Sequence, residues 1–222
     1  MEKHTIDVPS AETFFARPKT RRDFFKALAL AGVGATAGAA VLSREAGAQG
    51  MSDADILNFA LTLELLEGRF YEAAVGAGIL SGPALSVVTQ LRDTEFAHAD
   101  VLRVGIGLAG GTPAPEPQFN FPPDALTSQQ SVLQLAATLE PVGVGAYIGA
   151  GPMIQDPTIL EVAGSIGGIE GEHVVAINNL LGVVPPANEP FPKALTMEEV
   201  LAAAGPFLGM GAMPATGGPG AG

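Results

Sequence analysis

One polar pattern occurs twice in this chain and limits what the chain can fold into. Beyond the first 48 residues there are two histidines, His98 and His173, and each follows a glutamate by three positions, at Glu95 and Glu170. Residues three apart share one face of an α-helix, so each pair would present a carboxylate and an imidazole side by side. The pattern therefore predicts a helix at both places.

The sequence around these pairs is also duplicated. The segment Ala-Leu-Thr-Leu-Glu that ends at Glu64 resembles Ala-Ala-Thr-Leu-Glu, which ends at Glu140, and a tyrosine follows each glutamate by seven residues, at Tyr71 and Tyr147. These are the only two tyrosines of the chain. Each half therefore predicts a hairpin, in which a helix with Glu and Tyr on one face is joined by a turn to a helix with Glu-x-x-His.

Apolar residues recur at spacings of three and four in four long segments. This periodicity predicts helices over about 53–79, 83–108, 128–150 and 157–181. The residues expected to cap the later helices are polar and precede a helix start: they are Ser81, Thr127 (with Gln130), Asp156 and, for a short final helix, Thr196 (with Glu199). No strand pattern is long enough to support a sheet.

The third predicted helix contains residues that disfavour a regular helix. Pro141 directly follows Glu140, so we expect a kink or a local irregularity there. Glycines at 143, 145 and 149 lower helix stability, which indicates either close packing against that side or a looser helix.

Loop lengths predict how the helices are connected. Two or three residues join the first two helices and about five join the last two, so each pair forms an antiparallel hairpin. About 18 residues without periodicity lie between the hairpins; extended, they reach roughly 60 Å, whereas a helix of about 27 residues is roughly 40 Å long. The link can therefore run the length of the bundle.

We predict an all-α fold, with a four-helix bundle and one long crossover over residues 49–182. A loop and a short C-terminal helix follow over 183–208, and a disordered Gly/Pro-rich tail is expected over 209–222.

The first 48 residues differ in character from the rest. They carry seven of the eleven lysines and arginines, and the stretch 20–26, with Arg21 and Arg22, resembles a twin-arginine export signal. A weakly apolar run of 16 residues follows, and then Ala46-Gly47-Ala48, which a signal peptidase accepts. We expect export by the twin-arginine machinery to the periplasm or the outside. Cleavage after Ala48 is favoured over a retained anchor, because a membrane-spanning helix needs about 20 strongly apolar residues.

Composition excludes several kinds of site. The chain has no cysteine, which rules out disulfides, thiolate metal sites and cysteine nucleophiles. Its formal net charge of −12 argues against binding of nucleic acid, whose affinity depends on lysine and arginine.

With its duplicated Glu, Tyr and Glu-x-x-His pattern, the chain resembles the di-metal carboxylate branch of the ferritin-like superfamily, which includes bacterioferritin, rubrerythrin and manganese catalase. The string 57–61, with Glu64 and Tyr71 downstream, is similar to ferritin-like proteins grouped with the desiccation-related protein of resurrection plants. The resemblance covers about 53–182 and implies a ferritin-like bundle that holds two metal ions. The implied ligands are Glu64 and Glu140 (terminal), Glu95 and Glu170 (bridging), and His98 and His173 (one per metal).

The chemistry of these side chains agrees with that implication. Four carboxylates cancel the charge of two divalent ions, so the pair can lie in an apolar core. Oxygen-rich ligation with one imidazole per metal suits iron or manganese. Tyr71 and Tyr147 are either donors that orient the carboxylates or ordinary core residues.

The remaining glutamates near the pattern are expected to be solvated. Glu67 lies one turn from Glu64, but the repeat places Gly143 at the matching position, which does not support Glu67 as a ligand. Glu72 is also expected at the surface, and Glu172 is expected to point away from the site.

The expected function is redox chemistry with dioxygen or peroxide at an iron or manganese pair, of a peroxidase, catalase-like or ferroxidase type, in an exported protein. Three alternatives stay open: a non-enzymatic protein of stress or desiccation, an iron-storage protein, and a simple interaction module. Bundles of this type often form dimers, so a homodimer is a further expectation.

Overall fold

The structure is a computed structural model that describes residues 51–186 and 189–208. These residues form five α-helices: α3 (Asp53–Gly76), α4 (Gly82–Leu108), α5 (Gln129–Ala150), α6 (Pro157–Leu180) and the short α7 (Met197–Ala204). Within the described ranges there is no strand, and one isolated bridge joins Phe119 to Leu208. The predicted all-α four-helix bundle is confirmed. The predictions for residues 1–48 and 209–222 lie outside the described part of the chain.

The helix ends mostly follow the sequence, with two differences. The first helix ends at Gly76 rather than near 79, because Gly78 adopts a left-handed backbone (φ 68°) that an α-helix cannot continue through. The cap of α5 is Ser128 in a capping box with Ser131, not Thr127 with Gln130. The Thr127 hydroxyl instead donates to the carbonyl of Asp124 in the preceding turn.

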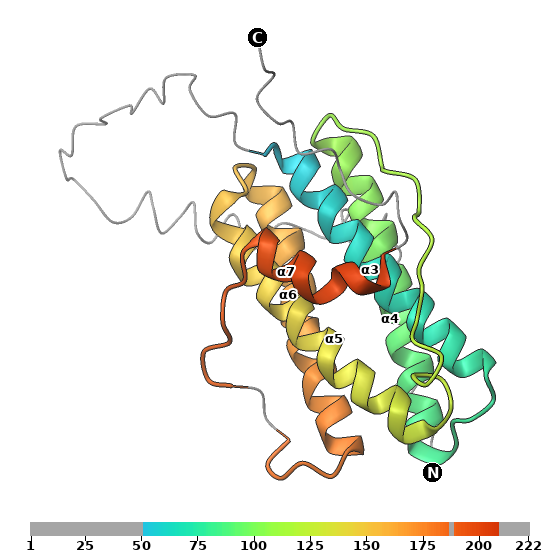
Figure 1. Cartoon of the computed structure of the whole chain (residues 1–222). Coiled ribbons are helices and arrows are strands. Elements are labelled where there is room, and N and C mark those ends of the chain that lie inside the picture. Colours follow the sequence, from blue (N-terminus) through green and yellow to red (C-terminus); the bar gives the residue numbers. More distant parts are fainter. Residues whose placement is uncertain (1–50, 187–188, 209–222) are drawn as a thin grey trace, which may run out of the picture.

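Contacts between helix ends establish the connectivity of the bundle. The Asp53 carboxylate at the start of α3 accepts hydrogen bonds from the backbone N–H groups of Gln155 and Asp156 at the start of α6. At the opposite end, the N–H of Ser81 donates to the side chain of Gln129, so α4 and α5 begin beside each other. The link from α4 to α5 must therefore traverse the bundle, and Figure 1 shows it running along the helices.

Helix α5 continues through Pro141 without a break. Two of its glycines leave one side of the helix without side chains, and the structure shows what packs there. A Cβ at Gly145 or Gly149 would collide with Leu195, whose N–H donates to the carbonyl of Gly145 at 2.9 Å. Of the two interpretations, close packing or a looser helix, close packing is therefore correct for these two glycines. They allow the segment before α7 to lie directly on α5. Figure 1 shows α7 crossing over the long helices.

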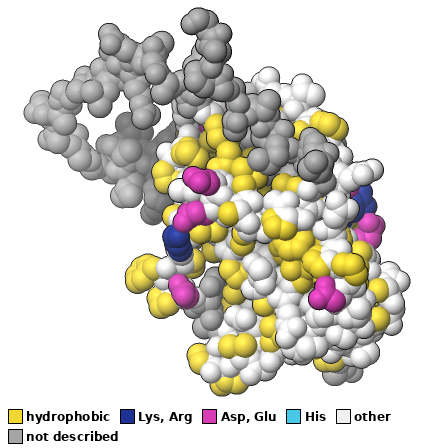
Figure 2. Space-filling view, in the orientation of Figure 1, with side chains coloured by type: hydrophobic (Ala, Val, Ile, Leu, Met, Phe, Trp, Pro, Cys, Tyr) yellow, Lys and Arg dark blue, Asp and Glu magenta, His cyan; other side chains and the backbone are white. Residues whose placement is uncertain are grey.

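The bundle has two apolar clusters in its interior. One includes Phe70, Tyr71 and Leu133, and the other includes Leu57, Leu102 and Tyr147. The segment Gln129–Met153 is long and apolar enough to cross a membrane by composition, but 56% of its most apolar window is buried within the bundle, as in a core helix. On the face shown in Figure 2, charged side chains are few, and most of them lie near the left and right edges.

Candidate metal centre

Four glutamates converge inside the bundle, and each comes from a different long helix. Glu64 lies on α3, Glu95 on α4, Glu140 on α5 and Glu170 on α6, and none has more than 1% of its surface exposed. All four were singled out from the sequence. A buried carboxylate is costly without a partner of opposite charge or a hydrogen-bond donor, so four of them in one place require an explanation.

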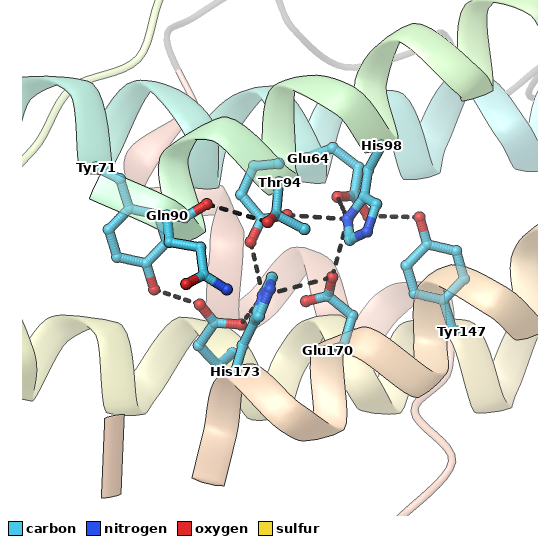
Figure 3. A network of polar contacts seen from close by, with 10 residues as sticks. Glu64, Tyr71, Gln90, Thr94, His98, Tyr147, Glu170 and His173 are labelled. Atoms are coloured by element: carbon cyan, nitrogen blue, oxygen red, sulfur yellow. Dashed lines mark hydrogen bonds and ion pairs between the residues drawn. The ribbon is translucent and has the colours of Figure 1, made fainter. Parts of the chain in front are cut away.

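His98, one turn after Glu95 on α4, turns its Nδ1 atom toward the carboxylates. This atom lies 2.9 Å from Glu64 Oε2, 3.2 Å from Glu95 Oε2 and 3.3 Å from Glu170 Oε1. Three carboxylates from three helices therefore surround one imidazole nitrogen (Figure 3).

His173 has the matching position on α6. Its Nδ1 atom lies 2.8 Å from Glu95 Oε1, 3.3 Å from Glu140 Oε2 and 3.9 Å from Glu170 Oε1. The two imidazole rings are 6.0 Å apart between centroids and inclined by 24°. The structure thus brings together all six residues that the sequence proposed as ligands.

The six side chains divide into two groups that share two members. Each group has its ligand atoms within 4.8 Å of one another and could hold a metal ion: Glu64, Glu95, His98 and Glu170 form the first, and Glu95, Glu140, Glu170 and His173 the second. Glu95 directs one oxygen toward each histidine, and Glu170 directs the same oxygen toward both. Two groups that share carboxylates could hold two ions with ligands in common.

The two tyrosines hold the outer glutamates. Tyr71 on α3 donates its hydroxyl to Glu140 on α5, and Tyr147 on α5 donates to Glu64 on α3. They lie at opposite ends of the cluster in Figure 3. Both are therefore donors to carboxylates of the cluster, one of the two possibilities that the sequence left open.

Several atoms at the centre are out of reach of water and form no hydrogen bond of good geometry, although some lie within ion-pair distance of one another. They are Glu95 Oε1, Glu140 Oε2, both oxygens of Glu170, and His173 Nδ1. Buried polar atoms in proteins are almost always paired. Carboxylate oxygens and an imidazole nitrogen that face one another without well-formed hydrogen bonds therefore fit metal ions, because a cation is a partner for both kinds of atom.

The titration of the cluster reflects its burial. Burial raises the pKa of the Glu64 carboxyl to about 7, and it raises that of Glu170 well above its usual value, with Glu95 adding to the effect. Burial also acts to raise the pKa of Glu95, but the two imidazoles outweigh it and hold that pKa below its usual value. For His173, burial acts to lower the pKa, but Glu95 and Glu140 outweigh it and raise the pKa to about 11. The site therefore retains protons that a bound cation would displace.

The expectation that Glu67 is solvated is wrong. Only 3% of the surface of Glu67 is exposed, and its Oε2 atom has no hydrogen-bond partner. A Cβ at Gly143 would lie 2.8 Å from Glu170 Oε2, which is too close, and 3.5 Å from Glu67 Oε1, which is ordinary contact, so both carboxylates lie against this side of α5. The spacing of three residues from Glu64 was the available signal, since it puts Glu67 on the same face of α3. By contrast, Glu72 and Glu172 are exposed, as expected.

Comparison with known proteins agrees with this geometry. No curated protein is similar enough to the chain to count as a match. One protein family, described as the ferritin-like domain, matches residues 52–183, which is more than half of the chain and includes all four long helices. On that match, and with an all-α bundle whose buried Glu and His groups could hold metal ions, this chain belongs to the ferritin-like domain family.

Proposed function

We propose that the chain binds two iron or two manganese ions and uses them for redox chemistry with dioxygen or peroxide. The observation that carries this proposal is the pair of three-Glu, one-His groups that share Glu95 and Glu170. In the proposal, Glu64 and Glu140 are terminal ligands, the shared glutamates are bridges, and His98 and His173 bind one ion each. Iron and manganese both accept this donor set and both change valence within it.

The charges of the donors support a pair of divalent ions. Four carboxylates carry four negative charges, which two divalent ions neutralise, so the filled site has little net charge to bury. Each histidine would bind through Nδ1, the atom that faces the carboxylates, and would be neutral when bound. Loading of the site therefore releases protons from the cluster.

The protein supplies orientation and a dry environment. The Tyr71 and Tyr147 hydroxyls orient the outer carboxylates, as donors to metal-binding carboxylates do in other proteins. The apolar clusters on either side exclude water, which strengthens electrostatic interactions at the site. What the bound ions supply is electron transfer to or from dioxygen or peroxide.

The compartment is part of the proposal. The twin-arginine pattern at Arg21 and Arg22, with Ala48 as the cleavage position, supports export to the periplasm or the outside. Proteins that take this route are translocated after folding, which suits a bundle loaded with metal in the cytoplasm. A role in protection against oxidative or desiccation stress would follow from peroxide consumption in that compartment.

Metal analysis and turnover of matched variants test the function. The full chain is loaded anaerobically with Fe(II) or Mn(II) and desalted, and its metal content is measured by elemental mass spectrometry, followed by peroxide- and dioxygen-dependent assays. We expect about two ions per chain. The buried Glu170→Gln variant should lose metal and turnover about tenfold or more, while the exposed neighbour Glu172→Gln should keep both.

The outcomes separate the alternatives. Two ions without turnover would favour a non-enzymatic stress protein, and a particle of many subunits in light scattering would favour iron storage. Well under one ion per chain in the unaltered protein, with Glu170→Gln no different, would contradict the proposal.

A further inference from the structure

Glu67 is a fifth carboxylate in the interior, and nothing in the two ligand groups requires it. It lies one turn after Glu64 on α3, with 3% of its surface exposed. Its Oε2 atom has no hydrogen-bond partner, and among the described residues no lysine, arginine or histidine forms an ion pair with it. Leaving such a group unpaired is costly, so its retention in the core points to a partner that completes it.

Gly143 on α5 shows where the Glu67 carboxylate lies relative to the cluster. A Cβ at 143 would collide with Glu170 Oε2 at 2.8 Å and would be in ordinary contact with Glu67 Oε1 at 3.5 Å, so both carboxylates lie against the same side of α5. Glu170 is shared by both ligand groups. Glu67 therefore lies close to Glu170, one of the two carboxylates that both proposed ion positions share.

The two halves of the internal repeat differ at the position of Glu67. Position 67 in the first half corresponds to position 143 in the second, so one half supplies a glutamate and the other supplies a glycine that lies beside it. The other ligands occur in matched pairs, one from each half. Glu67 is thus the feature that would make the two ion positions unequal.

We infer that Glu67 is a fifth carboxylate ligand of the metal pair, and that it approaches the pair beside Glu170, on the side of α5 where Gly143 lies. This rests on the proposed function, because it requires the pair to bind. Five carboxylates carry one negative charge more than two divalent ions neutralise. Glu67 therefore stabilises the pair when its total charge exceeds four, that is, after oxidation of one or both ions.

The test compares Glu67→Gln with Glu72→Gln in the full chain loaded with iron. The first variant removes the charge at nearly constant shape, and the second makes the same change at an exposed position of the same helix. The readouts are iron content, the midpoint potential from a spectroelectrochemical titration, and the Mössbauer spectrum of the oxidised form. A Glu67→Asp variant keeps the charge but shortens the reach, and so separates ligation from a charge effect at a distance.

We expect Glu67→Gln to keep two irons but to shift the midpoint potential to a more positive value, because the oxidised pair loses a negative ligand. Its oxidised Mössbauer spectrum should change, with the two irons becoming more alike, and Glu67→Asp should change the spectrum in the same direction. Thermal unfolding of the metal-free variants checks that they fold. Glu72→Gln should match the unaltered protein throughout.

An unchanged potential and spectrum in both Glu67 variants, with two irons bound, would overturn this inference and leave the proposed function intact. If Glu67→Gln changed the spectrum but Glu67→Asp kept the spectrum of the unaltered protein, the inference would also be overturned. The shortened side chain would then act by its charge alone and not as a ligand. Failure of the unaltered protein to bind two irons would overturn both.

Discussion

The hydroxyl of Tyr71 on α3 donates a hydrogen bond to Glu140 on α5, and so reaches the glutamate of the other half of the chain. The second tyrosine repeats this contact in the opposite direction, from α5 to Glu64 on α3. The two duplicated hairpins are therefore tied to each other through the site and not only through the apolar core. Each outer carboxylate depends on the helix across from it for its orientation.

Tyr71→Phe should weaken metal binding. Among the described contacts, the Tyr71 hydroxyl is the only one that donates a hydrogen bond to Glu140. Its removal leaves a buried carboxylate less well oriented. We expect the affinity for Mn(II), measured by isothermal titration calorimetry, to fall about tenfold, and the metal-free chain to lose about 1 kcal/mol of unfolding free energy. Thr138→Val is the control, since this exposed hydroxyl is close to Glu140 in sequence but donates to Gln134. Equal affinities for both variants would show that the tyrosine does not orient the ligand.

The metal-free protein should become less stable as the pH rises from about 5 to 8. The pKa of Glu64 is raised from 4.5 to about 7 and that of His173 from 6.5 to about 11. A group whose pKa is raised by folding stabilises the fold at low pH, and this contribution is lost as the pH rises through the folded-state value. For Glu64 alone, the loss between pH 4.5 and 7 is on the order of 3 kcal/mol.

Urea unfolding in the presence of a chelator, at pH 5, 6, 7 and 8, measures this dependence. Saturating Mn(II) should flatten or reverse it, because the ions replace the protons and bind more tightly at higher pH. A metal-free chain that gains stability toward pH 8 would be inconsistent with the buried cluster.

Gly149→Ala should loosen the segment before α7 without affecting the metal site. A Cβ at this position would overlap the backbone of Leu195, which cannot move aside without leaving α5. We expect a loss of about 1–3 kcal/mol in unfolding free energy from overpacking. Gly164→Ala is the matched control on α6, where a Cβ meets no atom within 4 Å, and it should be neutral or stabilising by up to about 1 kcal/mol. Similar stabilities for the two variants would contradict the close packing of Leu195.

Replacing Arg21 and Arg22 with lysine should block export. The prediction depends on the twin-arginine pattern in the first 48 residues and not on the fold. Fractionation of a bacterial host with a twin-arginine pathway should find the unaltered chain in the periplasm, shortened at Ala48, and the lysine variant in the cytoplasm at full length. Periplasmic accumulation of both would point to a different route.

Much of the architecture could be predicted from the sequence because the signals for a helix lie in residues close together in the chain. The apolar spacing, the capping residues Asp156 and Thr196, and the loop lengths all depend on residues close together in the chain. The six residues of the two ligand groups could be named for the same reason, since i and i+3 share a helical face whatever the surroundings.

The sequence does not predict features that depend on contacts between helices, such as the burial of a side chain or its hydrogen-bond partner. The sequence predicts a solvated Glu67, and the repeat, with glycine at the matching position, does not support it as a ligand; the structure buries it beside that glycine and Glu170. The glycines at 145 and 149 were ambiguous until the segment at Leu195 was found lying on them. The cross-pairing of Tyr71 with Glu140 also depends on α3 and α5 being adjacent.

The sequence alone determined the helices, the duplicated hairpins and the set of carboxylates and imidazoles, because these follow from periodicity along one helix. Only the tertiary structure decided which oxygen faces which nitrogen, which tyrosine holds which glutamate, and that a fifth carboxylate is buried beside the cluster. These depend on contacts between residues far apart in the chain, and such contacts exist only once the helices have packed.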